Sequence, residues 1–442
     1  MSVEESPFAT VLLIAIVAVA ASAEKFASSN DASIVQSNLW ALLVAGSKGY
    51  ENYRHQADIC HAYHVLRNHG VLEQNIVVMM YDDIASNNAN PTPGIIVNYP
   101  NGTDVYHGVR LDYTRELVTP QNFLDILQGN IVSGGSGKVI ASGPNDHVFV
   151  NFVGLGGFGV LSFPDGQLHA RNFARIIYEM EMKKMFSKMV IYVDADYSGS
   201  MFQSILIDNK NVYATTSAGP YEPSYSCYPD SFRKTYLGDA YSVRWMEYSD
   251  RVDLRKKTLS DQFNFVKQKT TNSNVMEYGN WRMGALFLSE FQGAHDTKPI
   301  VVPERLCHPV NSRDVPIQIV RHELQRASSP EAVLPIFYKL RAIHRKRTYL
   351  DNKVHEIATI ISKSNEEITK ALLAKNQPLN NFACFEHIVE NFNNRCFSLS
   401  ENPYALGSLR VLANMCEGDF GAENIIDAMS TACRFIDAKN IV

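Results

Sequence analysis

The sequence lacks the features that mark several large classes of protein. Its 442 residues contain no long run of lysine or arginine and carry a formal net charge of −5, so we expect no nucleic-acid partner. No segment is apolar over the about 18 to 20 residues that a membrane-spanning helix needs, so we expect no membrane anchor. The seven cysteines form no Cys-x-x-Cys pair, which disfavours a zinc site. The Gly-x-Ser-x-Gly elbow of the α/β-hydrolases is also absent.

The apolar run Ala9–Ala23 is too short to span a membrane and ends in the small residues Ala-Ser-Ala. This pattern predicts a signal peptide over residues 1–23, although two glutamates precede the run where lysine or arginine is usual. The polar residues 24–37 are then expected to form a mobile leader. A chain in the secretory pathway can be glycosylated, and Asn101 begins the one sequon that we find, Asn-Gly-Thr.

Four of the cysteines crowd the last part of the chain. In a secreted protein such a cluster predicts two disulfides that stabilise a small domain, and a zinc site is the alternative. The four are Cys384, Cys396, Cys416 and Cys433. The other three, Cys60, Cys227 and Cys307, are scattered.

Apolar segments alternate with helical patterns through the first two thirds of the chain. Strands are expected at 39–46, 75–81, 148–153 and 189–193, with helices at 56–69 and 173–186. Continuous apolar strands that alternate with helices indicate an α/β fold, with a mostly parallel sheet flanked by helices on both faces. Functional residues in such sheets gather beyond the carboxyl ends of the strands. These ends carry Gly46-Ser47, Asp82-Asp83, Gly154-Leu155 and Asp194-Ala195-Asp196.

The pattern changes near residue 295. Four prolines interrupt a polar stretch up to residue 316, which predicts a linker, and only helical patterns follow, for example over 350–375. We therefore expect an α/β domain over 38–294, a linker region over 295–345 and a helical domain over 346–442.

Two weaker motifs point to other chemistry. Asp194-Ala195-Asp196 has the Asp-x-Asp form of magnesium-dependent phosphatases, with Asp82-Asp83 as a second carboxylate pair, but it lies on a late strand and lacks a lysine partner. Residues 134–138 contain glycines and a lysine, but the spacing of a phosphate-binding loop is not met, so we interpret them as a flexible turn. We expect no bound metal and no cofactor.

Several long segments carry a specific resemblance. They are residues 44–58, 79–84, 100–106, 212–216, 236–239 and 291–293. In these segments the sequence resembles the legumain family of asparagine-specific cysteine endopeptidases. The resemblance implies a caspase-like α/β domain, a linker and an all-helical C-terminal prodomain that caps the active-site face. It also implies disulfides Cys384–Cys416 and Cys396–Cys433, and a lysosomal, vacuolar or extracellular location.

The two catalytic positions of that family are changed in this chain. Where the family reads Thr-Asp-His-Gly, residues 153–156 read Val-Gly-Leu-Gly, and where it reads Glu-Ala-Cys-Glu-Ser-Gly, residues 194–199 read Asp-Ala-Asp-Tyr-Ser-Gly. Leu155 thus stands in the general-base position and Asp196 in the nucleophile position, while Asn52 matches the residue that orients the histidine. A leucine cannot move a proton, and a carboxylate attacks an amide weakly, so the resemblance predicts an inactive peptidase. Cys227 matches a family cysteine and is predicted to be a small buried side chain, not a substitute nucleophile.

The family's specificity pocket has counterparts here. Recognition of an asparagine side chain requires a donor for its carbonyl and an acceptor for its amide. The resemblance assigns these roles to Arg54, Asp194 and Asp239, with His55 beside Arg54. The alternative is that the same residues form only a structural salt-bridge cluster.

Three hypotheses on function follow. The leading one is an inactive legumain homologue that acts by binding asparagine-containing peptides or proteases and its own prodomain. The alternatives are an active asparaginyl endopeptidase with unorthodox catalysis and a structural secreted protein without a ligand. The segment 319–329 contains no asparagine, so we expect no self-cleavage of the kind by which active family members release the prodomain.

Overall fold

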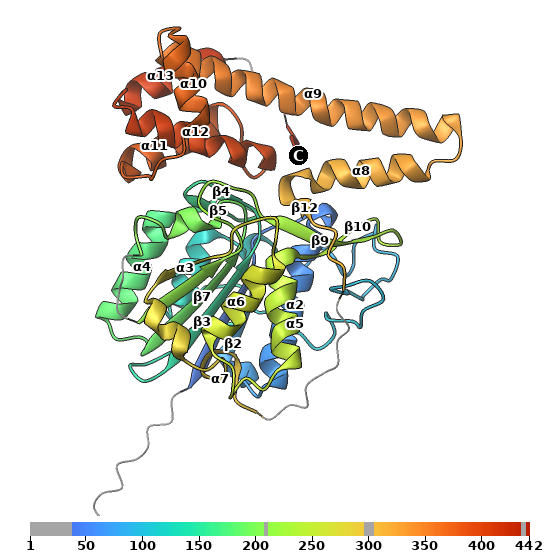
Figure 1. Ribbon diagram of the computed structural model, residues 1–442, viewed down its shortest axis with the longest axis vertical. Coiled ribbons are helices and arrows are strands. Elements are labelled where there is room, and N and C mark those ends of the chain that lie inside the picture. Colours follow the sequence, from blue (N-terminus) through green and yellow to red (C-terminus); the bar gives the residue numbers. More distant parts are fainter. Residues whose placement is uncertain (1–37, 207–210, 296–304, 435–438) are drawn as a thin grey trace, which may run out of the picture. The chain divides into compact units, whose positions relative to one another are not determined.

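A six-stranded sheet lies at the centre of the part of the chain that precedes residue 296 (Figure 1). The computed structural model describes residues 38–206, 211–295, 305–434 and 439–442, so the predicted signal peptide and leader lie outside the described residues. The strand order is β11-β8-β7-β3-β1-β2, and all neighbours are parallel except β11 and β8. The strands are β1 (Leu39–Ala45), β2 (Ile76–Met79), β3 (His147–Val153), β7 (Lys188–Asp194), β8 (Val212–Thr216) and β11 (Met276–Gly279).

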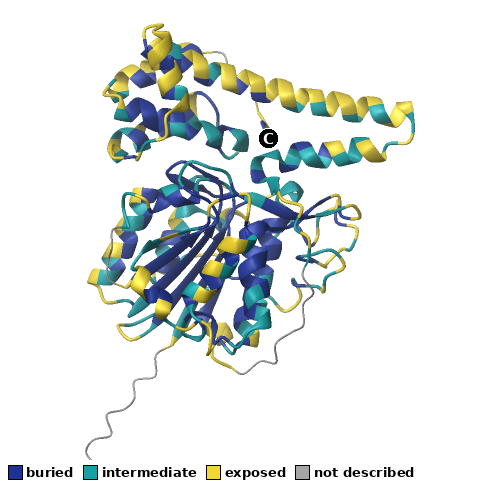
Figure 2. Cartoon of the chain, in the orientation of Figure 1, coloured by how far each residue is buried: buried dark blue, intermediate teal, exposed yellow. Residues whose placement is uncertain are grey.

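Alternation along the strands buries both faces of this sheet, and Figure 2 shows its strands as buried. In β1, Ala41 and Leu43 contribute to one hydrophobic cluster, whereas Leu42 and Val44 contribute to the other. The first cluster includes residues of α2 (Tyr53–Asn68), α5 (Ala240–Arg251), α6 (Leu259–Lys269) and α7 (Ser289–Gln292). The second includes residues of α3 (Pro120–Leu127) and α4 (Ala170–Met182). Helices therefore cover the sheet on both faces, as the continuous apolar strands predicted.

Two small antiparallel sheets lie beyond the carboxyl ends of the central strands. One follows β3 directly and contains β4 (Gly156–Gly157), β5 (Val160–Ser162) and β6 (Gln167–His169). The other contains β9 (Tyr225–Asp230), β10 (Thr235–Asp239) and β12 (Val310–Asn311). Short 3-10 helices connect the elements: η1 (Tyr50–Asn52), η2 (Glu73–Asn75), η3 (Arg115–Leu117), η4 (Ser198–Met201), η5 (Trp281–Ala285), η6 (Ser312–Asp314) and η7 (Pro403–Ser408). Through β12, the linker region adds a strand to the edge of β9.

The described residues after Asn311 form helices that are joined by turns and short irregular segments. The α-helices are α8 (Val315–Arg326), α9 (Pro330–Ile361), α10 (Glu366–Ala374), α11 (Phe382–Arg395), α12 (Leu409–Glu417) and α13 (Ala422–Ala432). The expected helical stretch 350–375 is divided, because residues 362–365 form a turn and the Asn365 side chain caps the start of α10. The boundary between linker region and helical domain that we expected after residue 345 falls inside α9. The third hydrophobic cluster joins these helices to Phe158, which follows β4, and to Val160, the first residue of β5.

Three disulfides connect the described residues. The pairs Cys384–Cys416 and Cys396–Cys433 are those that the resemblance implies. The third, Cys227–Cys307, was not predicted: Cys227 is buried as expected, but its sulfur is bonded to Cys307. The two cysteines are 80 positions apart in the sequence, and only the folded chain brings their Cα atoms to 4.9 Å. This bond attaches the linker region to β9, next to β12.

Residues 39–442 group into one compact unit. Across the described ranges, none of the helices combines the length and the apolar character that crossing a membrane would require.

Candidate functional site

The carboxyl ends of three central strands meet at one edge of the sheet. Strand register places Ala45 of β1 beside Val153 of β3, and Val153 beside Asp194 of β7. The backbone continues this alignment beyond the strands, because the Gly154 amide donates to the Asp194 carbonyl at 3.0 Å. The loops that carry Ser47, Leu155 and Asp196 therefore emerge together, as the parallel sheet predicted.

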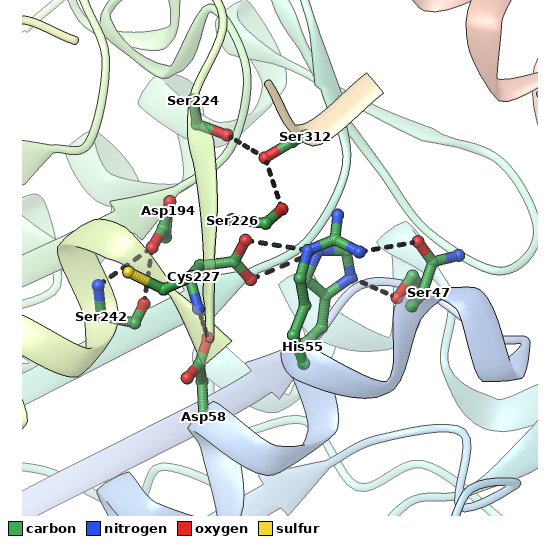
Figure 3. A network of polar contacts seen from close by, with 12 residues as sticks. Ser47, His55, Asp58, Asp194, Ser224, Ser226, Cys227, Ser242 and Ser312 are labelled. Atoms are coloured by element: carbon green, nitrogen blue, oxygen red, sulfur yellow. Dashed lines mark hydrogen bonds and ion pairs between the residues drawn. The ribbon is translucent and has the colours of Figure 1, made fainter. Parts of the chain in front are cut away.

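A network of polar contacts that includes His55, Asp58 and Asp194 lies beside this edge (Figure 3), and it contains a buried ion pair. Arg54, at the start of α2, donates through Nε to Asp239 Oδ1 at 2.8 Å, and both side chains are at most 3% exposed. Asp239 is the last residue of β10. His55 Nε2 lies 3.6 Å from Asp239 Oδ2, while His55 Nδ1 is hydrogen-bonded to the Ser47 hydroxyl at 2.6 Å. Three of the four predicted pocket residues are thus brought into direct contact.

Two further carboxyls surround Asp239. Asp194 accepts from the Ser242 amide at 3.1 Å and from the Ser242 hydroxyl at 2.7 Å. Asp58, one turn after Arg54 on α2, accepts the Asp239 backbone amide at 3.0 Å. Sequence reasoning missed Asp58, although its position four residues after Arg54 places both on one face of a helix.

The buried carboxyl groups of this cluster outnumber its cations, and their pKa values are raised. Burial, and then the negative charge of Asp239, raises the pKa of Asp194 to about 7. The same two effects raise the pKa of Asp58 well above its usual value, and burial raises the pKa of Asp239 against the opposing effect of Arg54. Burial and the Arg54 charge lower the pKa of His55 well below its usual value, so this imidazole is neutral. Arg54 is therefore the permanent cation of the cluster.

Two buried polar atoms of the ion pair have no hydrogen-bond partner among the described residues. They are Nη2 of Arg54, a donor, and Oδ2 of Asp239, an acceptor that lies only at ion-pair distance from His55. Buried polar atoms are rarely left unbonded in proteins. A carboxamide offers one acceptor and one donor, which is the complement of this pair.

Leu155 follows β3, and its own side chain cannot exchange a proton. Its half-buried side chain packs against the hydrophobic cluster of the C-terminal helices. Asn52, the last residue of η1, donates to the Lys48 carbonyl at 2.9 Å and accepts from Arg54 Nη1 at 3.5 Å. Leu155 and Asn52 line a common small cavity together with Asp196 and Arg313.

The Asp196 carboxylate has hydrogen-bond donors at one oxygen and an ion-pair partner at the other. Oδ1 accepts from the Ser224 amide at 2.7 Å and from the Ser224 hydroxyl at 3.1 Å. Oδ2 lies 3.0 Å from Nε of Arg313, a residue of the linker region, and the Asp196 side chain is 1% exposed. The carboxylate is thus enclosed and paired, and sequence reasoning identified neither Ser224 nor Arg313 as its partner.

Two family models match this chain. The model of the Peptidase C13 family matches residues 39–294, and the legumain prodomain model matches residues 338–433. The chain belongs to the peptidase C13 (legumain) family. The predicted fold class is confirmed, because the C13 model covers the α/β part and the prodomain model covers the helical part.

Curated relatives match this C13-family chain over most of its length. Legumain from Bos taurus is 45% identical over 404 residues, which cover 89% of this chain and 92% of that protein. Hemoglobinase from Schistosoma mansoni is 39% identical over 408 residues, with 91% and 94% covered. The vacuolar-processing enzyme delta-isozyme of Arabidopsis thaliana is 38% identical over 424 residues, with 89% and 90% covered. Among solved structures, caspase-1 from Spodoptera frugiperda gives a TM-score of 0.33 at 10% identity, covering 55% of this chain and 86% of that one.

The alternative motifs do not form a metal centre in the described residues of this C13-family chain. Asp82 accepts from the Tyr106 hydroxyl at 2.8 Å, and Asp83 accepts from Gln56 at 2.7 Å. The described residues contain no cluster of three or more potential metal ligands. Lys138 of the glycine-rich turn forms an ion pair with Asp112 at 3.1 Å. These side chains serve local structure.

The sequon and the remaining thiol lie away from the strand ends. Asn101 is exposed in a turn, with a positive φ of 58°, so its side chain is accessible for modification. Cys60 is the free cysteine of the described residues and is completely buried in the cluster beneath α2.

Proposed function

We propose that this C13-family chain does not hydrolyse peptide bonds and acts by binding asparagine-containing peptides or proteases. The observation that carries the proposal is the state of Asp196. Its carboxylate is 1% exposed, bonded to Ser224 and paired with Arg313. A carboxylate that is enclosed and paired with a guanidinium in this way is not presented to a substrate carbonyl.

The chemistry of a cysteine peptidase also finds no substitute nearby. Such an enzyme requires a thiolate and an imidazole that can exchange a proton with it. Of the cysteines that the structure describes, Cys227 lies nearest in the fold to the pocket strand β10, but its sulfur is bonded to Cys307. His55 is neutral, and its two ring nitrogens face Ser47 and Asp239. Losing one member of a catalytic pair typically reduces the rate by several powers of ten.

The pocket beside Asp196 supports binding as the remaining activity. Arg54 Nη2 and Asp239 Oδ2 together offer a donor and an acceptor without hydrogen-bond partners in the described residues. An asparagine side chain would satisfy both atoms, and Asp194 lies next to them with a pKa of about 7. A structural cluster alone would gain nothing from leaving these two atoms unbonded.

The linker region lies against β9, the strand that pairs with the Asp239 strand β10, and we infer that it covers the proposed pocket. Strand β12 pairs with β9, and the Ser312 hydroxyl is 3.1 Å from that of Ser224 and 3.3 Å from that of Ser226. A peptide ligand would therefore bind only after residues 310–312 are displaced. In the closed form, in which β12 pairs with β9, the chain's own prodomain would be the partner. Because 319–329 contains no asparagine, we infer that the chain does not cleave itself there and that the closed form persists.

We place this activity in the secretory pathway, in a lysosome or vacuole or outside the cell. The three disulfides of the described residues support an oxidising compartment. One relative is named a vacuolar-processing enzyme. The exposed sequon at Asn101 agrees with passage through that pathway.

The test combines hydrolysis and binding on the purified protein. We expect no turnover of a fluorogenic peptide with a central asparagine at any value between about pH 4 and pH 7, a range that spans the usual titration of carboxyl and imidazole groups. We expect the same peptide, labelled and uncleaved, to bind with higher affinity than a peptide with leucine in place of asparagine. Turnover that disappears in Asp196→Ala would refute the loss of hydrolysis. Equal affinity for the two peptides would refute the asparagine pocket.

A further inference from the structure

The guanidinium of Arg313 is enclosed where three parts of the chain meet. Its Nε is 3.0 Å from Asp196 Oδ2, beyond the end of β7. Its Nη2 donates to the Gly156 carbonyl of β4 at 2.6 Å, and its Nη1 donates to the Tyr404 carbonyl of η7 at 3.4 Å. One side chain from the linker thus bonds to the central domain and to the prodomain at once.

The surroundings of Arg313 form a fitted site. The Asp196 carboxylate is held in place by two bonds from Ser224, so its second oxygen is directed at the guanidinium. The Tyr197 ring lies 5.3 Å from Cζ of Arg313, within the range of a cation–π contact. A Cβ atom on Gly407 would come within 3.2 Å of Arg313 Nη1, so a glycine leaves room for the arginine there. The Arg313 side chain is 11% exposed.

We propose that Asp196, the Gly156 carbonyl and the Tyr197 ring form an arginine-binding site, and that Arg313 is its ligand within the same chain. A planar guanidinium can reach three acceptors in different directions, which a lysine ammonium at the end of a flexible chain does less well. A buried carboxylate without a cation would be strongly destabilising, so the site requires an occupant. In this chain the residue at the family's nucleophile position is therefore a docking residue.

Occupation of this site closes the substrate face. Arg313 belongs to η6, directly after β12, and the preceding Ser312 is hydrogen-bonded to Ser226, which pairs with Asp239 in the β9–β10 register. The next residue, Asp314, accepts from Arg347 of α9 at 2.6 Å, and Arg347 also donates to the Arg313 carbonyl. The docked arginine therefore connects β12 and Ser312 to the long prodomain helix α9. This inference goes beyond the proposed function, because it states what Asp196 binds whether or not the pocket accepts asparagine.

Hydrogen–deuterium exchange of the full-length protein tests the site. We expect Arg313→Ala to raise the exchange rate of the amides in 310–316 by at least about tenfold, because a buried ion pair is lost. The isosteric Asp196→Asn should raise the same rates. The double variant should exchange no faster than the faster single variant, because each change removes the same interaction. Arg321→Ala, an exposed position on α8, is the matched control and should leave 310–316 unchanged.

Chemical rescue separates binding at this site from general destabilisation. Added N-methylguanidinium should restore part of the protection of 310–316 in Arg313→Ala, and methylammonium at the same concentration should not. Arg313→Lys keeps the charge and should show an intermediate exchange rate. Unchanged protection in Arg313→Ala, additive effects in the double variant, or equal rescue by the two cations would each overturn the proposal. If 310–316 stays protected from exchange in Arg313→Ala and the protein does not hydrolyse peptides, the arginine site is rejected. The proposed function is then still supported.

Discussion

Arg54 Nε lies 2.8 Å from Asp239 Oδ1, although 185 positions separate the two residues in the chain. The pair joins the first turn of α2 to the end of β10 and is completely shielded from solvent. Asp58 and Asp194 also approach Asp239, so a single guanidinium balances a group of buried carboxyls. Arg54 is consequently important for the folded state as well as for any ligand.

Replacing Arg54 by alanine should reduce the free energy of unfolding by about 3–5 kcal/mol, because the buried carboxyls would lose their cation. Urea denaturation followed by circular dichroism measures this change. Arg321→Ala, on the exposed side of α8, should change it by less than about 0.5 kcal/mol. A loss below about 1 kcal/mol for Arg54→Ala would show that the carboxyls of the pocket are already neutral without it.

Stability should fall as the pH rises toward neutrality. The pKa of Asp194 is about 7 in the folded chain, above the value of about 3.9 for an unfolded aspartate, so the folded state holds this proton more tightly. Its contribution is fully present below about pH 4 and is lost as the pH rises through about 7, a difference on the order of 4 kcal/mol. The raised pKa values of Asp58 and Asp239 act in the same direction.

Asp194→Asn tests this dependence, because the neutral amide resembles the protonated acid and still accepts from Ser242. Urea midpoints measured from about pH 5 to pH 8, across the pKa of about 7, should fall less steeply in the variant than in the parent. Asp165→Asn, at an exposed turn, should follow the parent. Parallel curves for the parent and Asp194→Asn would contradict the raised pKa.

Thiol titration should find one free cysteine per chain, and only after unfolding. Cys60 is the unpaired cysteine of the described residues, and burial raises the pKa of its thiol, so the native protein should not react. The other six cysteines are paired. Titration with a chromogenic disulfide reagent, with and without denaturant, measures both states. Three reactive thiols in the unfolded chain would show that one of the three disulfides is not formed.

Placing a histidine at position 155 and a cysteine at position 196 should produce hydrolysis if the proposed assignment and the proposed pocket are correct. Leu155→His with Asp196→Cys supplies an imidazole and a thiol, and Asn52 is already at the start of α2. Because Arg313 would still cover the site, we expect the triple variant with Arg313→Ala to be more active than the double variant. The triple variant should cleave an asparagine peptide at a rate about a thousandfold or more above that of Leu155→His alone.

The matched substrate for this experiment has glutamine in place of asparagine. If the proposed Arg54–Asp239 pocket recognises asparagine, the reverted enzyme should discriminate against the longer side chain. Absence of asparagine-specific cleavage in the triple variant would mean that the pocket, and not only the catalytic pair, has been lost.

Much of the fold was predictable because its determinants are local. The apolar segments at 39–46, 75–81, 148–153 and 189–193 correspond to β1, β2, β3 and β7, and their parallel arrangement brings the strand ends to one edge. The cysteine cluster likewise predicted disulfides in the C-terminal helical part, where the paired cysteines are only 32 and 37 positions apart.

The sequence by itself determined the family, the order of strands and helices, and the presence of a leucine and an aspartate at positions 155 and 196. Only the tertiary structure decided what the substituted residues contact: Leu155 packs on the prodomain, and Asp196 pairs with Arg313. It also decided the Cys227–Cys307 bond and the position of Asp58 against Asp239. Hydrophobic periodicity and motifs act over a few residues, whereas the partner of a buried charge is chosen by whichever distant segment the fold brings within about 3 Å.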